Sequence, residues 1–126
     1  MTIESSGTGA ARVPDTTLTS AQFHILLTLA EGQRHGYGIM KEIECRTHGE
    51  VELGPGTLYR SLKQLLDRGL IEEVPRALDG RGDGSRERRS YALTPAGKVR
   101  TSEEAQRLRA LVRWAQEALV LEGGQG

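Results

Sequence analysis

The chain has 126 residues, and its 17 basic and 17 acidic side chains give a formal net charge of zero. This length suggests one domain, and a single cysteine excludes an internal disulfide and fits a reducing compartment. Neither a signal-peptide pattern nor an apolar run of the roughly 20 residues needed to span a bilayer is present, so we expect a cytoplasmic protein with no membrane partner.

Residues 1–17 are rich in Ser, Thr and Gly without periodicity, so we expect a disordered N-terminal tail. Thr19 or Ser20 can cap a first helix that reaches about Glu31. A helix that is apolar nearly all round is buried on both sides, and in so small a chain we expect a second subunit to cover one side. The two apolar stripes are Phe23, Leu26, Leu27 and Ala30, and Ala21, Ile25 and Leu29.

Two more helices and a hairpin follow. A turn over residues 31–36 leads into a second helix from about Tyr37 to Thr47, which the stretch 48–50 ends. A third helix begins at Pro55, because proline suits the first helical turn, and Gly69 is a good C-terminal stop. Residues 70–74 and 88–93 read as two strands joined by a Gly-rich loop over 77–85.

A long last helix starts at Thr94-Pro95 and reaches about Leu121, roughly 40 Å at 1.5 Å per residue. Its apolar stripe has no further domain to cover, so the expected partner is the last or the first helix of a second subunit. The alternative is a helix that folds back on its own core. The predicted dimer surface comprises Ile25, Leu29, Leu108, Leu111, Val112, Ala115 and Leu119.

This order of elements predicts a mainly α fold with a small β-hairpin, namely a winged helix-turn-helix over residues 18–93 and a dimerisation helix over 94–122. The third helix has leucines on one face. Its other face is polar and can contact phosphates and base edges, and its N-terminus attracts a phosphate, although an ordinary solvated face would look similar. The polar face consists of Gly56, Thr57, Arg60, Lys63 and Gln64, with Tyr59 at its border.

The hairpin favours double-stranded DNA as the partner of this face. Residues 54–93 hold eight basic and six acidic groups, whereas residues 1–53 hold four and seven. Arg81, Arg86, Arg88 and Arg89 surround the Gly-rich loop, and such a basic wing can follow a phosphate backbone or enter a minor groove. Three nearby acidic residues dilute this cluster, so we expect moderate affinity for each wing.

Three segments in this order, LTSAQFHILLTLAEGQRHGYGIMKEI, GPGTLYRSLKQLLDRGLIEE and RRSYALTPAGK, resemble the PadR family of bacterial regulators over about residues 18–98. The resemblance implies a winged helix-turn-helix, homodimerisation through the C-terminal helix and repression at palindromic operators. The single short C-terminal helix is similar to that of the compact branch of the family. The residues implied to lie near DNA are Tyr37, Thr57, Tyr59, Arg60 and Lys63, with Arg88 and Arg89 on the wing.

Some compact members of this family bind flat hydrophobic compounds at the dimer interface through a tryptophan of the C-terminal helix. Trp114 lies on such a helix, about two turns beyond the implied position, which Leu108 occupies. Trp114 and Leu108 are therefore candidates for binding a small hydrophobic effector, and dimer packing is the alternative role of Trp114.

No cofactor, metal or enzymatic activity is expected. Cys45 and His48 have a spacing that can share a ligand, but a structural zinc site usually takes four. No nucleophile and base have a spacing that supports catalysis. The sequence therefore predicts a sequence-specific DNA-binding regulator. The alternative is a winged-helix module that binds a protein and does not read DNA, which the zero net charge and the acidic N-terminal half favour.

Overall fold

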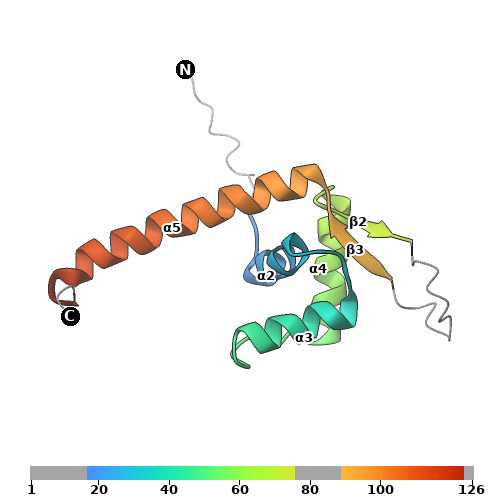
Figure 1. Cartoon of the computed structure of the whole chain (residues 1–126), viewed down its shortest axis with the longest axis horizontal. Coiled ribbons are helices and arrows are strands. Elements are labelled where there is room, and N and C mark those ends of the chain that lie inside the picture. Colours follow the sequence, from blue (N-terminus) through green and yellow to red (C-terminus); the bar gives the residue numbers. More distant parts are fainter. Residues whose placement is uncertain (1–16, 76–88, 124–126) are drawn as a thin grey trace, which may run out of the picture.

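The computed structural model describes residues 17–75 and 89–123. In it, three helices and a short sheet pack together, and one long helix projects from them (Figure 1). The expected tail, apart from Thr17, and the loop over residues 77–85 lie outside the described residues. The elements are α2 (Ser20–Ala30), β1 (Arg34–His35), α3 (Gly36–Arg46), α4 (Pro55–Asp67), β2 (Ile71–Val74), β3 (Ser90–Leu93) and α5 (Pro95–Gly123). The predicted fold class, mainly α with a small antiparallel sheet, is confirmed.

The helix boundaries follow from local chemistry. Thr19 caps α2 through a reciprocal pair of hydrogen bonds. The Thr19 hydroxyl accepts from the backbone amide of Gln22, and Gln22 Oε1 accepts from the backbone amide of Thr19. Thr94 caps α5 in a similar way, since its hydroxyl accepts from the Gly97 amide at 3.0 Å. Pro55 opens α4, and Gly69 takes a φ of 74° after its end.

The sheet has three strands in the order β1-β3-β2, and all pairs are antiparallel. β2 and β3 form the predicted hairpin, with Ile71 opposite Leu93. β1 corrects the expected turn over residues 31–36, because Arg34 and His35 pair with Tyr91 and Ser90. A strand of two residues is too short to produce a periodic pattern, so the pairing depends on the tertiary fold.

The core lies between α2, α3 and α4 and is closed by the sheet. Its fully buried side chains of largest volume come from the three helices and are Ile25, Leu26, Ile39, Ile43, Leu58, Leu62 and Leu65. The assignment of Ile25 and Leu29 to the dimer surface is wrong, because these side chains are only 0% and 3% exposed within the chain itself. The second side of α2 is covered by β3 and α5 of the same chain, and Leu27 and Ala30 are the apolar residues of α2 that stay exposed.

One face of α5 serves two regions. Gly97, Thr101 and Glu104 are buried against the rest of the chain and lie on one face at helical spacing. The same face continues beyond Leu108 into exposed apolar residues, where Leu111 is 42% and Leu119 is 67% exposed. Figure 1 shows this second half of α5 projecting away from the other helices. The half of α5 beyond Leu108 therefore does not fold back on the chain's own core along its described side chains. None of the described helices is long and apolar enough to cross a membrane.

Two ion pairs within the first half of α5 connect Glu104 to arginines one turn away on either side. The carboxylate of Glu104 is buried and accepts hydrogen bonds from Arg107 at 2.6 Å and Arg100 at 3.2 Å. The hydrogen bond from Arg107 is the largest of the effects that lower the pKa of Glu104 below its usual value. Glu104 is therefore ionised and paired at neutral pH.

We predict that Gly97→Ala destabilises the protein. A Cβ at this position would lie 2.0 Å from the backbone carbonyl oxygen of Leu70, so α5 must shift as a whole. We expect a loss of about 2–3 kcal/mol in the free energy of unfolding, measured by chemical denaturation. Gly56→Ala is the matched control, because a Cβ there meets nothing within 4 Å. Equal stability of the two variants would contradict the close contact.

The lowered pKa of Glu104 predicts how the stability of the protein falls at acidic pH. A carboxyl whose pKa is lowered by folding stabilises the native state above its ordinary pKa of 4.5. This contribution is lost as the pH falls through the lower folded pKa. In thermal unfolding scans below about pH 5, Glu104→Gln is expected to lose less stability on acidification than the wild type. Glu103→Gln, which removes an exposed neighbouring carboxylate, is expected to keep the wild-type slope.

Candidate nucleic-acid interface

α4 separates a buried face from a polar one. Leu58, Ser61, Leu62 and Leu65 are buried in the core. The opposite face is solvent-exposed and carries, in line, Gly56, Arg60 and Lys63, with Thr57 beside them. The residues that the sequence placed on the polar face are therefore exposed, as they must be to contact another molecule.

The two cations of this face differ in their surroundings. Lys63 Nζ lies 3.6 Å from Asp67 Oδ2, and both side chains are exposed. An exposed pair of this kind is weak, so Lys63 can exchange its carboxylate for another anion. Arg60 makes no ion pair with any of the described residues. Arg60 is thus the cation of α4 that is most available to a phosphate or a base.

Tyr59 borders this face where α4 meets the first turn of α3. An added Cβ on Gly36 would lie 2.7 Å from the Tyr59 hydroxyl, so the missing side chain of Gly36 makes room for the ring. The Tyr59 side chain is half-exposed, and Tyr37, the second residue of α3, is 59% exposed. Lys41 Nζ lies 5.8 Å from the centre of the Tyr37 ring. The first turns of α3 therefore add the hydroxyl of Tyr37 and the cation of Lys41 beside Tyr59 of α4.

Gln64 makes a contact within the chain that the sequence did not predict. It is exposed, but its Oε1 accepts a hydrogen bond of 2.9 Å from Nε2 of Gln22, a buried residue of α2. Sequence reasoning did not single out Gln22, although its position three residues after Thr19 is a capping-box signal. We therefore leave Gln64 out of the surface that faces a partner.

The wing is described only in its strands. Arg89 is exposed, and its guanidinium donates to Glu73 of β2 at 3.0 Å. Arg86 and Arg88 lie outside the described residues. Tyr91 of β3 is buried, and burial raises the pKa of its hydroxyl above its ordinary value. Tyr91 therefore stays protonated and structural, whereas Arg89 reaches solvent.

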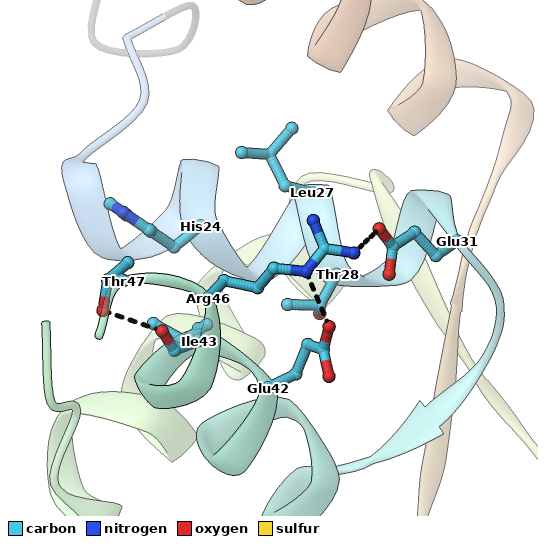
Figure 2. Close-up of a pocket in the computed structure, with 8 residues that line it drawn as sticks. All are labelled: His24, Leu27, Thr28, Glu31, Glu42, Ile43, Arg46 and Thr47. Carbon is cyan, nitrogen blue, oxygen red and sulfur yellow. Dashed lines mark hydrogen bonds and ion pairs between the residues drawn. The ribbon is translucent and has the colours of Figure 1, made fainter. Parts of the chain in front are cut away.

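A small pocket opens between α2 and α3, and no residue of α4 lines it (Figure 2). Arg46 crosses its mouth and donates to Glu42 at 2.9 Å and to Glu31. The hydrogen bond to Glu42 and the charge of Glu31 raise the pKa of Arg46. The other lining residues are His24, Leu27, Thr28, Ile43 and Thr47. The pocket is therefore bridged by its own ion pairs and lies apart from the α4 surface.

The metal and effector candidates are not assembled into sites within one chain. Among residues 17–75 and 89–123, no three His, Cys, Asp or Glu side chains are grouped as a metal site. Cys45 is exposed. Trp114 is 67% exposed, and it lies about 240° round α5 from the half-buried Leu108. These two residues therefore face different directions.

Comparisons with known protein sequences identify transcriptional regulators as relatives of this chain. The sequence model of the transcriptional regulator PadR-like family matches residues 25–103. A protein of Mycobacterium tuberculosis named transcriptional regulator Rv3488 is 37% identical over 106 residues, which cover 84% of this chain and 86% of that protein.

Solved structures show the same fold. A complex structure of RosR from H. salinarum is similar with a TM-score of 0.60 and 30% identity, covering 86% of this chain and 97% of that one. A PadR family transcription regulator from Clostridium difficile has a TM-score of 0.65 at 24% identity, covering 81% of this chain and 99% of that one. The second likeness shows the fold alone.

Proposed function

The chain belongs to the PadR-like family of transcriptional regulators, and from this premise we propose that it binds double-stranded DNA as a homodimer and represses transcription at a palindromic operator. One observation carries the DNA-binding part of the proposal. The outer face of α4 exposes Arg60 without an ion pair to the described residues, while Leu58, Leu62 and Leu65 on the opposite face are buried. A helix anchored on one side with exposed cations on the other fits a major groove.

Each residue of this surface has a chemical role. The bare backbone at Gly56 allows a close approach, and Thr57 can donate its hydroxyl to a phosphate. Arg60 reads a guanine edge or binds a phosphate, and Lys63 binds a phosphate after leaving Asp67. Tyr37 and Tyr59 contact the backbone beside the groove. Arg86, Arg88 and Arg89 belong to the wing, which follows the adjacent phosphates.

The dimer is supported by the projecting half of α5. Val112, Leu111 and Leu119 are between 42% and 67% exposed, and Ala115 is exposed on the same face. This apolar face continues the one that packs on the chain's own domain. A second copy of the chain covers it, because a two-fold partner offers the same face in return. Two copies also place two reading helices on half-sites about one helical turn apart.

Release of the operator by a small flat hydrophobic effector completes the proposal. Trp114 supports it, because a large indole that is 67% exposed on the dimerisation helix offers a stacking surface. Leu108 lies on the packed face of α5 and belongs to the dimer contact instead. A winged-helix module that binds a protein without reading DNA remains the alternative function.

The proposed DNA binding predicts which substitutions weaken DNA affinity. Arg60→Ala and Lys63→Ala should each weaken binding to DNA selected from the organism's own genome by about tenfold, because each removes a phosphate or base contact. Affinity is measured by fluorescence anisotropy at several salt concentrations, and the wild-type affinity should fall steeply with salt.

Lys98→Ala is the matched control, because it removes an exposed cation of α5 outside the α4 surface. We expect it to bind as the wild type does. Wild-type affinity for Arg60→Ala and Lys63→Ala would contradict the reading-helix role. A wild-type protein that selects no DNA at low salt, but retains a protein partner, would favour the interaction-module alternative.

The proposed dimer predicts how the chain assembles in solution. The wild type should sediment as a dimer at micromolar concentration, and the double variant Leu111→Asp/Leu119→Asp should sediment as a monomer, because buried unpaired carboxylates oppose association. Val99→Asp is the control, since Val99 is 58% exposed on the opposite side of α5. A monomeric wild type would refute the dimer.

A further inference from the structure

We infer that Gln22 is a positioning residue for α4, which ties the orientation of the reading face to the start of α2. The inference rests on the proposed function, because that function makes α4 the helix that reads DNA. Gln22 itself is only 4% exposed, so it acts on DNA through α4 and not by contact.

The carboxamide of Gln22 is bonded on both ends. Its Oε1 accepts from the Thr19 amide at 2.9 Å and from Arg68 Nη1 at 3.4 Å, and its Nε2 donates to Gln64 Oε1 at 2.9 Å. Thr19 caps α2, Gln64 belongs to the last turns of α4, and Arg68 is the residue that caps the end of α4. One buried side chain therefore connects the first turn of α2 to two points of α4.

These two points fix the rotation of α4. Gln64 and Arg68 are four residues apart and lie on the same side of the helix. Leucine side chains alone can adapt to a small rotation, whereas hydrogen bonds weaken steeply when their angle changes. Arg60 precedes Gln64 by one turn, so a rotation of α4 about its axis redirects Arg60 and Lys63 together.

Arg68 extends the link to the chain that precedes α2, because its Nη1 also donates to the carbonyl of Thr17 at 3.0 Å. The capping box would be complete with Thr19 and Gln22 alone. The additional bonds from Gln22 to Gln64 and Arg68 therefore have no role in starting α2, and their effect is on α4.

The test compares variants at residue 22 on specific and non-specific DNA. Gln22→Met keeps the shape and removes every hydrogen bond of the carboxamide, and we expect specific affinity to fall about tenfold with non-specific affinity unchanged. Gln22→Glu should rescue specific binding, because a carboxylate accepts from Thr19, Arg68 and a rotated Gln64 amide. Thr28→Val is the control, since Thr28 is also buried on α2 but its hydroxyl bonds within that helix, to Ile25.

A double-variant cycle separates positioning from direct contact. If Gln64 acts only through Gln22, Gln64→Met should cost no further specific affinity in the Gln22→Met background. Additive losses would overturn the inference, because they would mean that Gln64 touches DNA independently. A Thr28→Val variant that loses the same specificity as Gln22→Met would also overturn it, since any loss of α2 stability would then be sufficient.

Hydrogen exchange keeps this inference separate from the proposed function. In the free protein, Gln22→Met should speed amide exchange in the last turn of α4 more than Thr28→Val does. If the wild type selects no DNA, the proposed function fails, and the exchange result still decides the link between Gln22 and α4. Unchanged exchange at the end of α4 would refute that link.

Discussion

The leucine face of α4 is the constraint on which the rest of the structure depends. Leu58, Leu62 and Leu65 are at most 1% exposed and complete a core that α2 and α3 cannot close alone. Because the period of the helix places all of these leucines on one side, the opposite side faces solvent. The exposure of Arg60 and Lys63 is therefore a consequence of core packing, and the chemistry of the surface and the stability of the domain share one short helix.

Local signals predicted much of this architecture. Thr19, Pro55, Gly69 and Thr94 mark helix boundaries by chemistry that acts within a few residues, and the structure places each as expected. The polar set on α4 could be predicted for the same reason, since helical periodicity alone divides its faces. What failed depends on contacts distant in sequence. The two apolar stripes of α2 indicate that two of its sides are covered. They do not indicate whether the second side is covered by β3 and α5 or by another subunit.

The polar links show the same limit. Gln22 and Gln64 are 42 residues apart, and no local sequence pattern predicts the hydrogen bond between them. The pairing of Arg34 with Tyr91 is similarly distant and too short to leave a pattern. Charge was equally hard to read, because Lys63 and Arg89 carry carboxylate partners, Asp67 and Glu73, within 3.6 Å and 3.0 Å. A phosphate must compete with these partners, which moderates the attraction that a count of arginines suggests.

The continuous face of α5 has a geometric consequence. No loop or glycine separates the buried Glu104 from the exposed Leu111, so the domain and the projecting apolar face are joined by unbroken helix. One inserted residue between them would turn the projecting face by about 100° and advance it by about 1.5 Å relative to the domain. In the proposed dimer, the length and phase of this unbroken helix therefore fix the distance between the two reading helices. Substitutions in this stretch leave the phase of the helix unchanged, whereas insertions or deletions preserve it only in steps of whole helical turns.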